Sequence, residues 1–223
     1  MTGGHTKAPP LSITYSSVVS RESVRIEFLL VSLNDLDIFA CDIGNAYLNA
    51  KCREKFWIES VTEFGTEKGM IMIIARALYG LKISGYTWRS KLVETLMSLG
   101  YKLSEADADL WMKKEFNPNV DPYYKYMIYY VDYFLHIGFN PKGYMYALNM
   151  IYQLKEGFGS PGRYLGANVE KLQLKGGQVV CSTNCVDYLK SATKNVDNLL
   201  GVDKTALKNY VDGDKPYLFI FRP

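Results

Sequence analysis

Two short apolar runs that meet at a single aspartate constrain the fold of this chain more than any other feature. Residues 127–137 carry Asp132 near their middle, and β-branched and aromatic residues fill both arms. Such arms are typical of β-strands, so the segment predicts two strands joined at Asp132. A carboxylate buried there without a partner would be costly. Either Asp132 begins an exposed turn, the commoner fate of one aspartate in an apolar run, or it lies at a hairpin tip and binds a metal ion.

A second apolar run also ends on an acid. Residues 37–41 lead to Asp42, and the Gly-Asn pair at 44–45 then favours a turn. If both strands deliver their aspartate to the same edge of one sheet, the carboxylates form a site for a hard cation, because Mg²⁺ prefers oxygen ligands and needs few from protein. Without a cation the two acids would repel and one would stay protonated. Asp42 and Asp132 are therefore the predicted metal site.

Three motifs, in this order along the chain, resemble those of a known enzyme family. Residues 42–49 (Asp-Ile-Gly-Asn-Ala-Tyr-Leu-Asn) are similar to the first catalytic motif of reverse transcriptases, and residues 130–133 (Tyr-Val-Asp-Tyr) to their Tyr-x-Asp-Asp box. Between them, residues 76–88 resemble the Leu-Tyr-Gly-Leu-Lys-Gln-Ser-Pro-x-x-Trp signature of copia-type (Pseudoviridae) LTR retrotransposons. The resemblance runs from about Gly3 to about Leu200. One departure is serious, because Tyr133 stands where the family has its second aspartate.

The resemblance implies an RNA-directed DNA polymerase that joins a deoxynucleoside triphosphate (dNTP) to a primer 3′-hydroxyl on an RNA or DNA template. In that reaction two Mg²⁺ ions, roughly 3.5–4 Å apart, steady the attacking and leaving oxygens. Asp42 and Asp132 match the acids that contact metal, and Lys155 is a candidate general acid for the departing pyrophosphate. By resemblance, the nucleotide-binding residues would be Ile43, Tyr47, Gly80, Lys82 and Ser84, and the primer-grip region would include Tyr164, Leu165 and Gly166.

Several of these side chains also have ordinary interpretations. In reverse transcriptases a bulky residue at the position of Tyr47 excludes a ribose 2′-hydroxyl, whereas composition alone favours an aromatic residue of the core. Lys155 is equally compatible with a solvated surface lysine. Arg89 could contact phosphate, although the solvated face of a helix is the commoner place for such a residue. Asp107 and Asp109 could suggest a second metal site, although acids in turns commonly accept hydrogen bonds from their own backbone.

Activity depends on what replaces the missing acid. A tyrosine hydroxyl, with a pKa near 10, stays protonated at neutral pH and cannot replace a carboxylate. Losing one charged ligand is expected to remove a few kcal/mol of transition-state stabilisation, about a hundredfold or more in rate. Reverse transcriptases of this type also have a complete fingers subdomain and an RNase H domain. We expect the parts of these that this sequence lacks to come from another segment or to be absent. These departures favour an alternative, a dead relic or repurposed module that binds nucleic acid or a partner. An unrelated α+β interaction module is a third possibility.

Composition sets broad limits on the class of protein. The 223 residues are 48% hydrophobic and 22% charged, which is typical of globular proteins. A net charge of +3 and a pI near 8.5 are only mildly basic and would not alone suggest a nucleic-acid partner. The four cysteines lack the spacing of a zinc site, and no apolar run could span a membrane. We therefore expect an intracellular chain with free thiols, in a cytoplasmic particle or the nucleus.

The predicted fold class is α+β, in the form of a right-hand polymerase palm. Such a palm has an antiparallel sheet with helices packed on one face, here with partial fingers and the start of a thumb. The apolar run 70–75 predicts a buried strand. We expect one domain over residues 1–200 and a tail over residues 201–223 that no motif assigns. Hydrophobic periodicity predicts helices over about residues 20–34, 88–99 and 141–152, and Gly100 is expected to stop the second. A cap at residues 182–184 predicts a last helix to Leu200, which resembles the start of the thumb.

Overall fold

The computed structural model describes residues 14–200, so the start of the expected domain and the expected tail at 201–223 lie outside the described residues. The helices are α1 (Arg21–Leu33), α2 (Ser84–Ser98), α3 (Pro141–Ile151) and α4 (Val186–Leu200), with two 3-10 helices, η2 (Ala46–Asn49) and η3 (Thr62–Glu67). The strands are β1 (Asp37–Ile43), β2 (Trp57–Glu59), β3 (Ile71–Ile73), β4 (Lys102–Leu103), β5 (Leu110–Phe116), β6 (Pro122–Tyr130), β7 (Tyr133–Gly138), β8 (Leu154–Gly159), β9 (Arg163–Tyr164), β10 (Ala167–Gln173) and β11 (Val179–Asn184). The four helices predicted from the sequence are all present.

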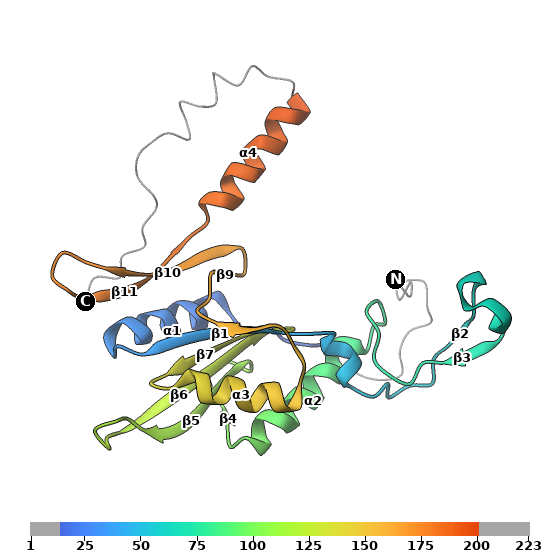
Figure 1. Cartoon of the computed structure of the whole chain (residues 1–223), viewed down its shortest axis with the longest axis horizontal. Coiled ribbons are helices and arrows are strands. Elements are labelled where there is room, and N and C mark those ends of the chain that lie inside the picture. The colour runs from blue at the N-terminus through green and yellow to red at the C-terminus, as the bar shows by residue number, and fades with distance from the viewer. Residues whose placement is uncertain (1–13, 201–223) are drawn as a thin grey trace.

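A six-stranded sheet in the order β4-β5-β6-β7-β1-β8 forms the centre of the molecule (Figure 1). Every neighbouring pair in it is antiparallel. Strands β6 and β7 form a hairpin that turns over Val131 and Asp132, since Tyr130 pairs with Tyr133. The antiparallel sheet and the two strands predicted around Asp132 are therefore confirmed.

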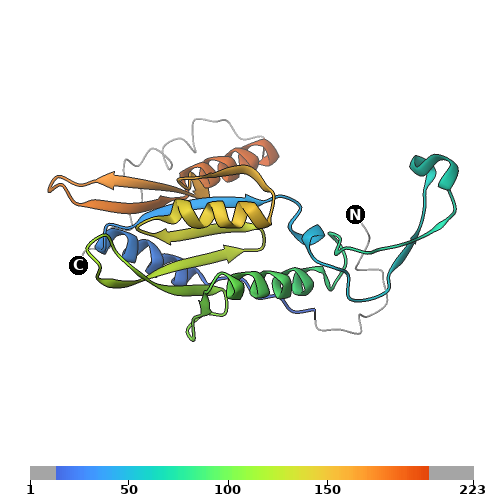
Figure 2. The same ribbon diagram turned by 60° about the horizontal axis from the view of Figure 1, so that its bottom comes forward.

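Each face of this sheet carries its own core, because side chains alternate between the faces along a strand. Trp88 and Leu92 of α2 and Leu148 of α3 pack on one face, and Val24 and Phe28 of α1 pack on the other. Figures 1 and 2 show α1 on the opposite side of the sheet from α2 and α3. The prediction that the helices cover one face is therefore wrong. The central strand β7 has apolar residues on both faces, and both must be covered.

Local signals in the sequence explain where the helices begin and end. Ser20 caps α1, because its Oγ accepts a hydrogen bond from the Ser23 amide at 3.0 Å. Asn140 caps α3 in the same way, and Pro141 occupies the first helical position. Helix α2 ends before Gly100, whose φ of 83° lies in the left-handed region that favours glycine.

A two-stranded hairpin, β2–β3, extends away from the central sheet and carries η3 at its tip (Figures 1 and 2). The apolar run 70–75 supplies β3, but Ile71 and Ile73 are 67% and 76% exposed. The strand is present, and the prediction that it is buried is wrong. An apolar run shows that a strand can be covered, whereas its place in the fold decides whether anything covers it.

A smaller three-stranded sheet, β11-β10-β9, lies against the face that α1 covers, and α4 follows it. Tyr164 and Val169 of this sheet pack into the same core as α1. The Lys171 ammonium joins it to the start of β1, donating to the Leu36 carbonyl at 2.9 Å and to Asp37 at 3.0 Å. These contacts place the turn between β9 and β10 beside the central sheet.

Glu27 of α1 is a buried acid. Only 1% of its surface is exposed, and its Oε2 atom has no hydrogen-bond partner among residues 14–200. Burial raises the pKa of Glu27 from 4.5 to about 8. Between these two values the unfolded chain ionises this group while the folded chain keeps it neutral. The group therefore destabilises the fold increasingly as the pH rises from 4.5 to about 8.

We expect Glu27→Gln to raise the free energy of unfolding at pH 8 by an amount on the order of a few kcal/mol, and to change it little at pH 4.5. The amide keeps the size of the protonated acid and removes its ionisation. Urea unfolding followed by circular dichroism at the two pH values measures this difference. Glu22→Gln, at an exposed position of the same helix, serves as the control. A gain of equal size at both pH values would contradict the ionisation account.

Candidate active site

Two neighbouring strands bring Asp42 and Asp132 to the same end of the central sheet. Asp42 of β1 lies opposite Tyr133 of β7, and the Ile43 amide donates to the Asp132 carbonyl at 2.8 Å. Asp42 retains 31% side-chain exposure, and Asp132 is half-buried. Ile43 is fully buried, so only its backbone could face a ligand. The structure thus brings together the two acids that the sequence singles out.

The turn after β1 lies close to Gln153, the residue just before β8. The Gly44 amide donates to the Gln153 carbonyl at 2.9 Å, and a Cβ at Gly44 would lie 3.2 Å from that same oxygen. Asn45 then adopts a φ of 50° and leads into η2. The Gly-Asn pair therefore forms a sharp turn, and β1 ends at Ile43, one residue after Asp42.

The hairpin tip that carries Asp132 is held by a tryptophan from α2. The Trp88 Nε1 atom donates to the Val131 carbonyl at 2.7 Å. Val131 has a φ of 59°, a region that β-branched residues rarely adopt and that costs on the order of 1–3 kcal/mol. In the sequence, Trp88 was identified only as the last residue of the second motif. The sequence could have suggested the hydrogen bond from Trp88 to a backbone carbonyl, because a buried indole N–H needs an acceptor.

Charges around Asp132 oppose one another. Burial raises the pKa of Asp132, and the nearby Asp42 carboxylate raises it further, while Lys155 and a hydrogen bond from Tyr79 lower it. The Lys155 ammonium lies 3.7 Å from Asp42 Oδ2 and is 64% exposed. The site therefore contains two carboxylates and one solvent-facing ammonium, and repulsion between the acids is only partly relieved.

Two stacked tyrosines lie beside the acids. The rings of Tyr47 and Tyr79 are 4.3 Å apart. Burial raises the pKa of both hydroxyls, and Asp132 raises both further. Tyr47 packs partly against the core, and the effect of Asp132 on its pKa indicates that the hydroxyl also lies near the acids. Its role in excluding a 2′-hydroxyl stays a prediction. Tyr79 was missed, although it directly precedes Gly80 in the second motif.

Of the residues that follow Tyr79, Gly80 and Lys82 are exposed and Ser84 is buried. Gly80 has a φ of 94°, a backbone conformation that residues with a Cβ rarely adopt, and this explains why a glycine occupies the position. Lys82 is exposed on the turn that enters α2. Ser84 is only 1% exposed, and its hydroxyl donates to the Leu78 carbonyl at 2.6 Å. Ser84 therefore holds this turn together in the described structure.

The ring of Tyr133 lies beside the small sheet. Its ring lies 5.5 Å from that of Tyr164, which is 3% exposed. Burial raises the pKa of the Tyr133 hydroxyl, and Cys41 and Asp42 raise it further, so this side chain stays neutral. Leu165 and Gly166, with φ of 49° and 85°, form the turn next to Tyr164. Of the expected primer-grip residues, Tyr164 thus lies against the residue that replaces the second acid.

The donor set bears on whether a metal ion fits here. Residues 14–200 contain no group of three or more His, Cys, Asp or Glu side chains arranged to hold a metal. Two carboxylates are nevertheless compatible with Mg²⁺, which keeps several of its waters. A cation between them would also relieve the repulsion that raises the pKa of Asp132. Asp42 and Asp132 therefore fit a magnesium site that is poorer by one acid than the family pattern.

Asp107 and Asp109 do not form a second metal site. Asp107 accepts hydrogen bonds from the Asp109 amide at 2.9 Å and from the Ser23 hydroxyl at 2.6 Å, as expected of a turn acid. Asp109 is fully buried and accepts from Arg89 Nε at 3.1 Å and from the Tyr129 hydroxyl at 2.6 Å. The interpretation of Arg89 as a residue of a solvated face is therefore wrong.

The described structure is thus an α+β fold whose central antiparallel sheet presents two aspartates at one end. The family model described as "Reverse transcriptase (RNA-dependent DNA polymerase)" matches residues 9–200, and the chain belongs to this family. The copia-type resemblance is confirmed by similarity to transposon proteins.

These relatives are distant and longer than this chain. A transposon Ty5-1 protein of Saccharomyces cerevisiae is 25% identical over 75% of this chain and 53% of its own length. The Pol polyprotein of transposon TNT 1-94 from Nicotiana tabacum is 26% identical over 56% of the chain, and that of transposon RE1 from Arabidopsis thaliana 26% over 62%. The chain spans about half of the yeast protein and 9% of each polyprotein. No solved structure matches.

Across residues 14–200, helices long and apolar enough to cross a bilayer are absent.

Proposed function

We propose that this chain is the RNA-directed DNA polymerase domain of a copia-type retrotransposon. The observation that carries the proposal is the register of β1 and β7, which sets Asp42 beside the Asp132 turn in a chain of the reverse transcriptase family. In this proposal the central sheet with α2 and α3 is the palm, and the β2–β3 hairpin belongs to partial fingers. The small sheet leads into a thumb that begins with α4.

The proposed substrates are a dNTP and an RNA or DNA template–primer. Mg²⁺ bound to Asp42 and Asp132 would stabilise negative charge on the phosphates and on the attacking oxygen. Tyr47, supported by its stacking on Tyr79, is assigned to the nucleotide sugar, where its ring would exclude a 2′-hydroxyl. Lys155, exposed and beside Asp42, is assigned to protonate the departing pyrophosphate.

The remaining assignments follow the turns around the acids. Gly80 and Lys82 lie on the exposed turn before α2 and are assigned to the nucleotide. Ser84 supports that turn from inside, and the Ile43 backbone supports the metal site. The primer grip is assigned to Tyr164, Leu165 and Gly166.

One observation favours a second candidate function. Tyr133 occupies the register position opposite Asp42 where the family has an acid, and its hydroxyl stays neutral. A palm that lacks one ligand could persist as a catalytically dead relic or as a module that binds nucleic acid or a protein partner.

Primer extension on poly(rA)/oligo(dT) with dTTP distinguishes the two candidates. We expect slow extension by the unaltered chain in Mg²⁺, and none in EDTA or by Asp42→Asn, because the carboxylate pair is then without its cation or incomplete. Circular dichroism shows whether each variant is folded. A folded chain that binds the template–primer but extends nothing, even at high enzyme concentration, would support the second candidate instead.

A further inference from the structure

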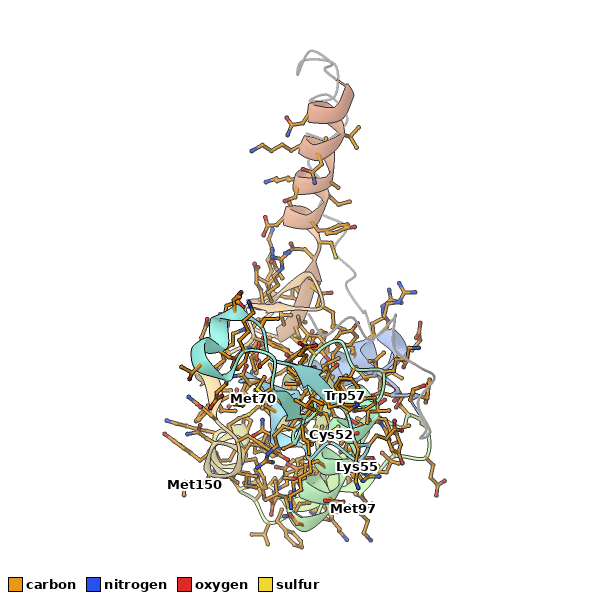
Figure 3. The ribbon with its side chains drawn as sticks, turned by 90° about the vertical axis from the view of Figure 1, so that its right-hand side faces the viewer. Cys52, Lys55, Trp57, Met70, Met97 and Met150 are labelled. Atoms are coloured by element: carbon orange, nitrogen blue, oxygen red, sulfur yellow. The ribbon has the colours of Figure 1, made fainter. Side chains whose placement is uncertain are left out.

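One face of the β2–β3 hairpin is apolar at its centre and open to solvent. Trp57 pairs with Ile73 across the two strands and Glu59 pairs with Ile71, so these four side chains lie on the same face. All four are exposed, Trp57 by 61% and Ile73 by 76%. We call this face the open face of the hairpin. Figure 3 looks onto this end of the molecule, and Trp57 lies on the side toward the viewer.

The other face of the hairpin is better covered. Ile58 and Met72, which pair on that face, are half-buried, and Ile74, two residues after Met72, is buried. An isolated two-stranded hairpin is marginally stable in water and gains stability when an apolar face packs against another element. The open face is therefore the part of the hairpin on which further packing would add most stability.

Opposite charges flank the centre of the open face. Exposed and half-buried residues alternate from residue 51 to residue 59, so Lys55 and Glu59 lie on the exposed side with Trp57. Each is two residues from Trp57, about 7 Å along an extended strand. Within residues 14–200 neither of these two charged side chains forms an ion pair. The open face therefore carries a positive charge on one side of its centre and a negative charge on the other.

The same separation of charge extends along the hairpin. Residues 51–55, at its base, contain three basic side chains and one acidic one. Residues 59–68, toward its tip, contain three acidic side chains and one basic one. Two such hairpins attract each other when they lie antiparallel, because each basic base then meets an acidic tip, and they repel each other when they lie parallel.

We propose that the open face binds the same face of a second copy of this chain, with the two hairpins antiparallel. A two-fold axis beside Trp57 then places Lys55 of each copy opposite Glu59 of the other, because both residues are equally far from Trp57. Trp57 and Ile73 of both copies form the apolar centre, and the two ion pairs lie at its edge. An apolar centre with a charged rim is the usual anatomy of a protein interface.

Single-stranded nucleic acid is the other ligand that could cover an exposed indole. On this face its phosphates would meet Glu59 as well as Lys55, and Ile71 and Ile73 would stay uncovered. A second copy instead covers the isoleucines and pairs both charges, so it satisfies every exposed group of the open face. This inference does not depend on the proposed function, because the face can pair whether or not the chain extends a primer.

Sedimentation velocity without nucleic acid tests the association directly. The hairpin face is small, so we expect dimers that form with a micromolar Kd. Trp57→Ala should raise this Kd by about thirtyfold or more, because it removes the central aromatic anchor. The control Met150→Ala removes an apolar side chain that is 87% exposed on α3 and should leave the Kd unchanged.

Exchanging the two charges tests the antiparallel arrangement. Lys55→Glu and Glu59→Lys each set like charges opposite each other at both symmetry-related positions, and each should raise the Kd by about tenfold or more. Lys55→Glu/Glu59→Lys restores opposite charges between the copies and should bring the Kd back close to that of the unaltered chain. Lys142→Glu, at an exposed position of α3, should change nothing. Circular dichroism shows that each variant is folded.

Tryptophan fluorescence reports whether Trp57 lies in the contact. Trp88 and Trp111 are 2% and 0% exposed, so quenching by acrylamide is expected mainly at Trp57. We expect strong quenching at protein concentrations below the Kd and weaker quenching above it, because the second copy covers the indole. Trp57→Phe should abolish this dependence on concentration.

Any of three results would overturn the proposal. The first is a chain that stays monomeric from micromolar to submillimolar concentration. The second is a dimer whose Kd the double charge exchange does not restore, which would reject the antiparallel pairing. The third is protection of Trp57 by added oligo(dT) while the chain stays monomeric, which would assign the face to nucleic acid. Dimers with the expected charge dependence and no primer extension would uphold this inference and reject the polymerase proposal alone.

Discussion

Tyr133→Asp is expected to raise the rate of Mg²⁺-dependent primer extension by about a hundredfold or more. The substitution places a carboxylate at the register position opposite Asp42, next to the turn that holds Asp132. One additional charged group at a site where transition-state charge develops is worth roughly 3–4 kcal/mol, and each 1.36 kcal/mol is tenfold in rate. Single-turnover extension of a labelled oligo(dT) primer on poly(rA) measures the change.

Tyr133→Asn is the matched control, because it has the size of aspartate without the charge. It also removes the same ring contact with Tyr164, so any structural effect of losing that contact appears in both variants. Thermal unfolding of each variant reports how much that contact contributes to stability. Equal extension rates for the Asp and Asn variants would mean that the missing charge at Tyr133 does not limit this chain, and the account of impaired activity would fail.

Asp109→Ala is expected to lower the free energy of unfolding by about 3 kcal/mol or more. Asp109 is fully buried and accepts hydrogen bonds from Arg89 Nε and the Tyr129 hydroxyl. Burial and this carboxylate together raise the pKa of Tyr129, so the tyrosine remains a donor. Alanine would leave the partly buried Nε atom of Arg89 and the buried hydroxyl of Tyr129 without their acceptor. Urea unfolding at pH 7 measures the loss from the transition midpoint and slope.

Two further variants show whether the loss comes from this network. Glu105→Ala removes an exposed acid of the same loop and should change stability by no more than about 0.5 kcal/mol. Tyr129→Phe removes only the hydroxyl and should cost about 1 kcal/mol, since the acid keeps Arg89. If Asp109→Ala destabilises no more than Glu105→Ala, the network does not hold α2 to the loop before β5.

Patterns that act over a few residues were predicted well. The periodic leucines after Trp88 indicated α2, and Gly100 marked its end, because helix periodicity and a left-handed stop are local properties. The acid between two apolar arms indicated the β6–β7 hairpin with Asp132 at its tip. The motif around Gly80 and its neighbours indicated the family, and the family model confirms it.

Other features depend on which surfaces meet, and the sequence alone did not determine them. The run 70–75 is apolar enough for a core, yet nothing in the described structure covers the open face of Ile71 and Ile73. Arg89 has the spacing of a solvated residue but meets a buried acid twenty positions away. Lys125 is another example, because its buried ammonium pairs with Glu115 and lies 3.2 Å from the centre of the Tyr144 ring.

Whether a feature could be predicted from the sequence depends on how far apart in the chain the interacting residues are. By itself the sequence determined the strands that carry Asp42 and Asp132, the order of the motifs, and the residue, Tyr133, that departs from the family pattern. The tertiary structure alone decided that α1 lies on the opposite face from α2 and α3, and that Trp88 holds the hairpin tip. Helix and strand signals arise from neighbours along the chain, whereas burial and long-range hydrogen bonds arise from segments that only the folded chain brings together.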